Sequence, residues 1–318
     1  MDNLTHTLTG LVLSRAGLNR FYARPALVLM LAANIPDIDV VMATRGALRY
    51  FEVHRSITHS WFMLPLMALI PVAIACAVSR SMKGWLGAWC ISMVGVVSHL
   101  LLDWTNAYGI RFLTPLSEKW FRLDLNNIVE LWIWIVLLLA CVAPMLGKLV
   151  NAEIGAKAGG IGRGWAIFGL SFILIYDFGK YQIHQRALET LNSRIYLGGP
   201  PIQVAAFPVT IVNPFRWQGW VDRPNAAISF SMNLLEPFDP ASGAVYYKPE
   251  PGPEIEAARH TEAAQIFLKF AQFPLWRVTP VAEPEGAHRV EVRDWRFPFG
   301  AVAIVDASNH VLASSFHF

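Results

Sequence analysis

The sequence is poor in charged residues, which excludes an ordinary soluble protein for the chain as a whole. Charged residues make up 15% of its 318 residues, whereas 54% are hydrophobic. Soluble domains have about a quarter of their residues charged, so this composition predicts a chain that is embedded in a membrane over part of its length. The net charge of +3 is small and scattered, which argues against a nucleic-acid partner.

Cysteine is also scarce, and its positions exclude two classes of site. The three cysteines, Cys76, Cys90 and Cys141, all fall inside apolar runs, where a thiol behaves as a small hydrophobic side chain. They predict neither a disulfide framework nor a cysteine metal site. The first apolar run lacks a preceding basic segment and a following small-residue cleavage site, so we expect it to be retained and not removed as a signal peptide.

Long apolar runs end near residue 184, which predicts two domains. Residues 185–318 hold 14 of the 20 prolines and no run of the roughly 20 apolar residues that a membrane helix needs. We therefore predict an α-helical membrane bundle over 1–184 and a smaller soluble, strand-rich α+β domain over 185–318. In the second domain we expect strands within 202–212 and 226–235, a helix at 254–273 and a terminal hairpin over 288–318.

Six segments of the first domain are candidate membrane helices. The segments at 4–18 and 25–43 are less typical, because the first is short and Pro36 interrupts the second. The other four are apolar and close to the length that spans a bilayer, and they are 58–79, 85–104, 128–147 and 164–181.

If all six segments cross the membrane, their polar residues gather at one membrane face. Ionisable groups inside a bilayer cost roughly 2.5 kcal/mol or more each at a helix centre, so they tend to be functional. Imidazole and carboxylate groups are the usual ligands of zinc and related ions. The sequence therefore predicts a metal site from His6, Asp37, Asp39, His54, His59, His99, Asp103 and Glu130. The histidines and aspartates alone exceed the four ligands of one tetrahedral ion, which predicts two or more ions.

Local spacing supports convergence of these side chains. His99 and Asp103 are four residues apart, so one helix directs both toward the same place. His54 and His59 are five apart and converge only if His54 lies in a loop and Thr58 caps the next helix. Pro36 disturbs the helix before Asp37 and Asp39, which lets their side chains turn toward the site.

This ligand chemistry favours hydrolysis of a phosphate ester. Metal ions lower the pKa of a bound water toward neutrality and neutralise phosphoryl oxygens. Arg55 can hold a phosphate oxygen and Asn106 can position the substrate; Arg55, Asp39 and Asn106 are our candidate catalytic residues. Because the site lies at headgroup depth, we expect a lipid or lipid-linked phosphoester as substrate.

Four sequence blocks carry a resemblance to a known family. The runs 5-THTLTG-10, 35-IPDIDV-40, 54-HRSITHS-60 and 98-SHLLLDWTNAYGIRFLTP-115 resemble the signature blocks of the YdjM/YbcI family of membrane-bound, predicted metal-dependent hydrolases, over about residues 1–150. That family is in turn similar to zinc-dependent phospholipase C and P1-type nucleases. This similarity implies metal roles for His6, Asp37, His54, His59, His99 and Asp103. The chain departs from that group at 126-NNIVE-130, where a His-x-x-x-Glu pair is expected and only Glu130 remains.

Other interpretations stay open. The same residues can be helix-end hydrogen-bonding groups, the cation site of a transporter, or structural metal ligands of a membrane scaffold whose C-terminal domain binds a partner. The clustering at one membrane face and the lack of an inverted repeat disfavour a transporter. We expect a multi-pass protein of the bacterial inner membrane. The basic residues of the short loops opposite the site place the site and the C-terminal domain outside the cytoplasm.

Overall fold

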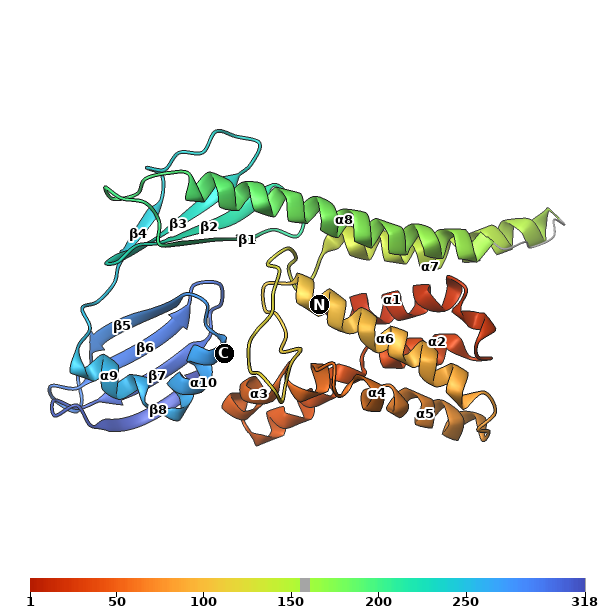
Figure 1. Cartoon of the computed structure of the whole chain (residues 1–318), viewed down its shortest axis with the longest axis horizontal. Coiled ribbons are helices and arrows are strands. Elements are labelled where there is room, and N and C mark those ends of the chain that lie inside the picture. Colours follow the sequence, from red (N-terminus) through yellow and green to blue (C-terminus); the bar gives the residue numbers. More distant parts are fainter. Residues whose placement is uncertain (155–160, 318) are drawn as a thin grey trace.

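The chain folds into a helical part followed by a separate strand-rich part, as predicted (Figure 1). The structure is a computed structural model that describes residues 1–154 and 161–317. Lys157, one of the basic residues in the predicted short loops opposite the site, lies outside the described residues. The helical part and α8 lead into two antiparallel sheets, and the second sheet lies beside α3 and the loop that follows α6.

Eight α-helices and three short 3₁₀ helices lie in the described residues before the sheets. The α-helices are α1 (Asn3–Arg15), α2 (Pro25–Ala32), α3 (Ala47–Val53), α4 (Leu64–Met67), α5 (Leu69–Ser79), α6 (Trp85–Thr105), α7 (Leu131–Glu153) and α8 (Ile161–Asn192). The 3₁₀ helices are η1 (Leu18–Arg20), η2 (Ile35–Arg45) and η3 (Ile57–His59).

Two of these helices are long and apolar enough to cross a membrane. They are α6 and α7, and two bent pairs raise the number of candidate spans to as many as four. α2 and η2 meet at 43° next to Pro36, and the segment from α3 to η3 meets the one from α4 to α5 at 90°. The six crossings are therefore not confirmed, because α1 has 13 residues, or about 20 Å of helix, and the predicted 58–79 span is broken after His59.

Small residues let the first helices pack closely. A Cβ atom at Gly10 of α1 would lie 2.5 Å from the Leu29 carbonyl oxygen of α2, and one at Gly95 of α6 would lie 2.7 Å from the Ala32 Cβ. Close backbone approach through glycine is a common way for membrane helices to associate. α2 is thereby held between α1 and α6, which carry His6, His99 and Asp103.

The C-terminal part consists of two four-stranded antiparallel meanders. The first contains β1 (Gln203–Pro208), β2 (Arg216–Asp222), β3 (Ala226–Asn233) and β4 (Ala244–Tyr247), in that order. The second contains β5 (Pro274–Pro280), β6 (His288–Asp294), β7 (Gly300–Val305) and β8 (Val311–His317). Two helices, α9 (Pro253–Arg259) and α10 (Glu262–Phe270), connect the sheets and cover the second one.

The sequence predicted this part in outline. The expected strands within 202–212 and 226–235 are β1 and β3. The expected helix at 254–273 is divided, because Thr261 starts a new helix by accepting a hydrogen bond from Ala264 N. The expected terminal hairpin is a three-stranded meander, since β6 precedes the β7–β8 hairpin. Asn309 adopts a left-handed conformation in the turn of that hairpin.

Each sheet is attached to the helical part by its own apolar cluster. α8 continues unbroken through residue 184, where we predicted the domain boundary, and its last turns pack Ala187 and Leu191 against Trp217 and Phe230 of the first sheet. The second sheet is attached by an aromatic cluster. This cluster includes Phe51 of α3, Tyr108 of the loop after α6, and Phe267, Phe270 and Phe299 of the C-terminal part.

A buried arginine reinforces this attachment. The Arg296 side chain is almost fully buried and bonds Asp294 Oδ1 at 2.8 Å and Oδ2 at 3.0 Å, while its Nη1 donates to the Ala107 carbonyl at 2.9 Å. Nη1 also lies 3.6 Å from Asp124 Oδ1. Burial alone would raise the pKa of Asp294, but its bonds with Arg296 outweigh burial and lower it. Burial dominates at Asp124, whose pKa is raised to about 6 despite the nearby arginines.

We expect Arg296→Ala to destabilise the protein by roughly 3 kcal/mol, because removing one partner of a buried ion pair leaves the other charge uncompensated. The matched control is Arg293→Ala, since the Arg293 side chain is 49% exposed and bonds only a neighbouring strand residue, Glu291. Thermal unfolding of the detergent-purified variants measures the difference. Equal melting temperatures for the two variants would show that Arg296 does not hold the domains together.

Candidate metal centre

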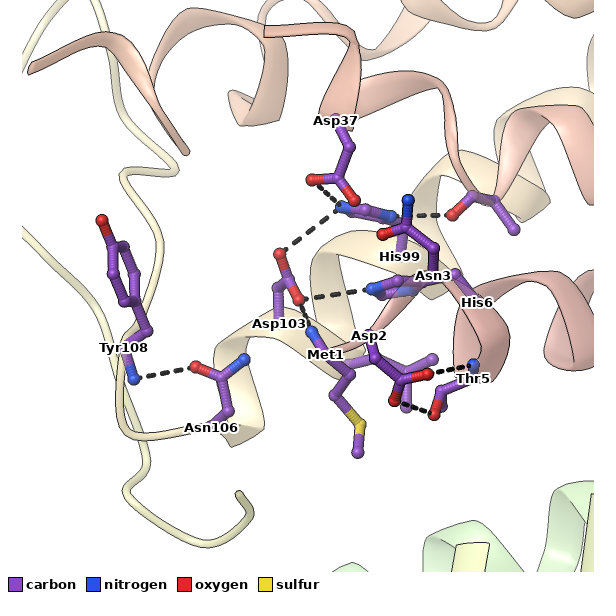
Figure 2. Close-up of polar contacts among 12 residues, drawn as sticks. Met1, Asp2, Asn3, Thr5, His6, Asp37, His99, Asp103, Asn106 and Tyr108 are labelled. Carbon is purple, nitrogen blue, oxygen red and sulfur yellow. Dashed lines mark hydrogen bonds and ion pairs between the residues drawn. The ribbon is translucent and has the colours of Figure 1, made fainter. Parts of the chain in front are cut away.

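Three separate parts of the helical domain bring the candidate ligands together. His99 and Asp103 lie on the last two turns of α6, and Asp37 and Asp39 lie on η2. His59 ends η3, a few residues after His54 at the end of α3. Figure 2 shows Asp37, His99 and Asp103 pointing toward one another.

Asp37, His59, His99 and Asp103 form a four-residue group that can hold a metal ion. The His59 and His99 Nε2 atoms are 3.2 Å apart, and each lies 3.4–3.7 Å from an oxygen of Asp37 and one of Asp103. A tetrahedral zinc ion with bonds of about 2.1 Å keeps its ligand atoms about 3.4 Å apart. Five of the six separations between these ligand atoms therefore match the edges of one tetrahedral site, and the sixth, between the two carboxylates, is at most 4.8 Å.

The hydrogen bonds of the two histidines also fit a cation. His99 Nδ1 lies 2.7 Å from the Ala33 carbonyl oxygen, an acceptor, so Nδ1 carries the proton. Thr58 Oγ1 donates to Asp39 Oδ2 at 3.3 Å and therefore accepts from His59 Nδ1 at 2.9 Å. Both neutral rings then present Nε2 lone pairs to each other at 3.2 Å. A metal ion between them would turn this repulsion into ligation, and bonded Nδ1 atoms are typical of metal-bound histidines.

Burial of Asp103 supports the same conclusion. Its side chain is fully buried, and its Oδ2 atom has no hydrogen-bond partner in the described part of the chain. Its close neighbours are Arg55 Nε at 3.1 Å and the two histidine Nε2 atoms. Arg55 already supplies one compensating charge at this buried oxygen, and its remaining lone pair faces the two histidine Nε2 atoms, where a metal ion would bind it.

Asp37 also belongs to a second group of possible ligands. Asp37, Asp39 and His54 offer ligand atoms that lie within 4.8 Å of one another. In this group His54 Nδ1 is 2.9 Å from Asp39 Oδ1, and Asp39 Oδ2 also accepts the Arg55 backbone N–H at 3.0 Å. Asp37 therefore belongs to both groups and would contribute to either ion position, whereas Asp39 additionally fixes the loop that carries His54.

Thr58 does not cap a helix, contrary to our expectation. The helix predicted to open at His59 begins at Leu64, and η3 with a sharp turn precedes it. Thr58 instead bonds Asp39 and His59. His54 and His59 converge because Arg55 has a positive φ of 54°, which reverses the chain between them.

His6 lies beside the four-residue group and not within it. Its ring stacks on that of His99 with centroids 3.9 Å apart, and its Nε2 atom is 3.4 Å from Asp103 Oδ1 (Figure 2). The Met1 amino group contacts the same oxygen. Both ring nitrogens of His6 are buried without a hydrogen bond in the described chain, so the ring packs His99 in place and its nitrogens stay open to a ligand.

Glu130 lies in a different buried network. Its carboxylate is 3.5 Å from Lys180 Nζ, accepts the Tyr176 hydroxyl at 3.0 Å and accepts the Asn127 N–H at 2.8 Å. The structure therefore places Glu130 with α8 and outside both groups of possible ligands. Asp177, on the same helix as Lys180, accepts the Asn126 side-chain amide at 2.7 Å.

Arg55 and Asn106 form a rigid pair at the edge of the site. The Arg55 guanidinium is buried, and its Nη1 donates to Asn106 Oδ1 at 3.1 Å and to the Gly109 carbonyl at 3.2 Å. It also lies over the Tyr108 ring, 4.9 Å from the centroid. Because Asn106 Oδ1 additionally accepts the Tyr108 and Gly109 N–H groups, Asn106 holds Arg55 and its own loop in place.

The site opens into a cavity of about 480 Å³. Asp37, His54 and Arg55 line it on the polar side. Tyr108, Phe297 and Phe299 line it as well, so the C-terminal domain forms part of its wall. Sequence reasoning missed these aromatic residues, because they lie in the loop after α6 and in the β6–β7 connection, where no periodic pattern shows what a side chain faces.

We expect His59→Ala or His99→Ala to remove bound metal, because each deletes one of four ligands. Asp39→Asn should weaken metal binding about 10–100-fold by loosening the Thr58–His59 contact and His54. Metal content of the purified variants, measured by mass spectrometry, gives the result. His310→Ala is the control, since that side chain is 79% exposed. Wild-type metal content in His99→Ala would exclude the four-residue group as a metal site.

We expect Glu130→Gln to keep the wild-type metal content, because Glu130 pairs with Lys180. The substitution should instead destabilise the protein by about 3 kcal/mol or more, since it leaves the buried Lys180 charge unpaired. Metal content and melting temperature are measured on the same sample. Loss of metal at unchanged stability would restore Glu130 as a ligand.

Comparison with known proteins agrees with this geometry. The chain is 30% identical over 143 residues to the uncharacterized protein YfhP of Bacillus subtilis (strain 168), a match that covers 42% of this chain and 43% of that protein. The chain thus spans less than half the length of this curated relative. No solved structure matches. The model of the YdjM inner membrane protein family matches residues 1–186, which include both groups of possible metal ligands, and the chain therefore belongs to the YdjM inner membrane protein family.

Proposed function

We propose that this protein is an integral-membrane, metal-dependent hydrolase that cleaves a phosphoester of a lipid or lipid-linked substrate. The observation that carries the proposal is that the four-residue group is closed on all sides except at Asp37. The Asp37 side chain is 19% exposed, and it lines the site cavity together with His54 and Arg55. Structural metal sites are closed, whereas catalytic sites keep a position open to water or substrate.

The residues present suit zinc or a similar ion, and Asp37 can bridge two of them. When bound, such ions would supply an acidified water as nucleophile and neutralise charge on a phosphoryl group. Asp37, His59, His99 and Asp103 would hold one ion, and Asp37, Asp39 and His54 would contribute to a second. The membership of Asp37 in both groups is what supports a two-ion hydrolase over a protein with a single structural ion.

Arg55 supplies the positive charge that a phosphate needs. Its guanidinium lines the cavity and is held against Asp103, Asn106 and Gly109. A donor that is fixed before the substrate arrives needs no reorganisation during the reaction, which is the main source of electrostatic catalysis. In this proposal Arg55 binds the phosphate, Asn106 positions Arg55, and Asp39 orients His54 and the Thr58–His59 pair.

The proposed location is the outer face of the bacterial inner membrane. The site residues lie at the end of α6 and next to the start of α7, the two helices that are candidate spans by themselves. Phosphoester groups of lipids lie at this depth. A transported cation would be expected nearer the membrane centre, which favours a hydrolase over a transporter.

We expect Arg55→Lys to keep bound metal and to lower kcat/KM about 100-fold, because lysine cannot reproduce the fixed guanidinium contacts. The assay is hydrolysis of bis(p-nitrophenyl) phosphate and of phosphatidic acid by the metal-loaded, detergent-purified protein. Arg49→Lys is the control, because Arg49 is an exposed residue of the same segment that pairs with Glu52. Failure of metal-loaded wild type to hydrolyse any phosphoester tested would contradict the proposal.

A further inference from the structure

A second cavity of about 580 Å³ lies next to the cavity of the metal site. The two cavities share Tyr108, Ile128 and Phe297 in their walls. Beyond these shared residues the second cavity is bounded by Phe207 and Val209 at the end of β1 and by Trp295 before β7. Its walls are mostly apolar, and they come from both domains. A mostly apolar cavity therefore adjoins the cavity that Arg55 lines, with Tyr108, Ile128 and Phe297 between the two.

Hydrogen bonds place this second cavity at the membrane surface. Trp132, on the first turn of the candidate span α7, donates its Nε1–H to the Val212 carbonyl at 2.8 Å. The Asn127 side-chain amide donates to the Thr210 carbonyl at 3.3 Å. Since tryptophan at the end of a membrane helix lies among the lipid headgroups, the segment 209–212 that it binds lies at the same depth.

The mouth of the second cavity is surrounded by exposed apolar side chains. Ile128, Val209, Ile211 and Val212 are each about half exposed although they are aliphatic. Ile128, Val209 and Ile211 also line the cavity. Apolar residues gathered at a surface indicate contact with a partner or with lipid, and at headgroup depth the adjoining apolar phase is the bilayer.

We propose that this second cavity is a lipid-chain subsite, which receives the hydrocarbon chain of a lipid phosphoester while its phosphate lies at Arg55. The inference rests on the proposed function for the identity of the head group, and it names the substrate class as a membrane lipid with a long apolar chain. Two features support this occupant over a soluble phosphoester. The cavity lined by Arg55 and the apolar cavity share three wall residues, and exposed aliphatic side chains lie at the edge of the apolar cavity.

The C-terminal domain thereby gains a defined role in substrate selection. Trp295 and Phe297 belong to the segment that Arg296 anchors to Ala107, so the wall they form is held firmly against the helical part. Val209 lies on the opposite wall, directly after β1. The subsite exists only when both sheets are docked on the helical domain.

The test uses Val209→Asp beside the matched control Val212→Asp. The two valines are 51% and 53% exposed and lie in the same segment, but only Val209 lines the second cavity. The probes are dioleoyl and dihexanoyl phosphatidic acid, whose binding to the detergent-purified full chain is measured by native mass spectrometry. We expect Val209→Asp to lower the ratio of the dioleoyl affinity to the dihexanoyl affinity about tenfold. A carboxylate in an apolar cavity disfavours a bound hydrocarbon chain.

The expected result for Val212→Asp is an unchanged ratio. An equal fall of the affinity ratio in both variants would mean that the segment only touches the membrane surface. An unchanged ratio in both variants would mean that the cavity holds no chain. Either result would overturn the proposal. Val209→Asn repeats the test without a charge, and wild-type metal content shows that each variant is folded.

Hydrolysis is scored separately on the wild type. Chain-dependent binding that is sensitive to Val209 in a protein that hydrolyses no phosphoester would support the lipid-chain subsite and contradict the proposed function. Hydrolysis by a wild type whose binding does not depend on chain length or on Val209 would support the proposed function and contradict the lipid-chain subsite.

Discussion

The convergence of two histidines and two aspartates inside an apolar helical domain is the constraint on which the rest of this structure depends. Burial of such groups is expensive unless they are paired or bind a metal. To bring Asp37, His59, His99 and Asp103 within bonding distance of one ion, the chain interrupts its helices twice. α2 ends before Pro36, and the chain turns by 90° between η3 and α4, directly after His59. Continuous membrane helices through these residues would keep the aspartates and histidines on separate helix faces.

Spacing within one segment predicted the local arrangement of polar residues better than their partners in other segments. His99 and Asp103 could be paired from their helical spacing, and the break at Pro36 from the geometry of proline. Glu130 shares the predicted membrane face, yet it lies with Lys180 of α8. Position along an apolar run fixes the distance from the membrane surface, whereas the neighbour across the bundle is decided by helix packing. The same limit applies to Thr58, whose partner Asp39 is 19 residues earlier in the chain.

The placement of the C-terminal domain was also beyond sequence reasoning. Alternating residues predicted β1, β3 and the last hairpin, because alternation follows from the geometry of a strand. Docking instead depends on aromatic residues from distant segments, such as Phe51 on α3 and Phe270 on α10, which meet edge to face at 5.2 Å. Each of these side chains looks like an ordinary core residue in the sequence, and only the tertiary structure shows that together they join two domains.

One chain of contacts connects this docking to the metal centre. Arg296 donates to the carbonyl of Ala107, and the preceding residue, Asn106, accepts from Arg55. Arg55 holds a positive φ and lies against Asp103. A positive φ in a bulky residue persists only where surrounding contacts determine it, and here those contacts come from the loop that Arg296 fixes. The C-terminal domain therefore stabilises the strained residue that sets the charge at the edge of the metal site.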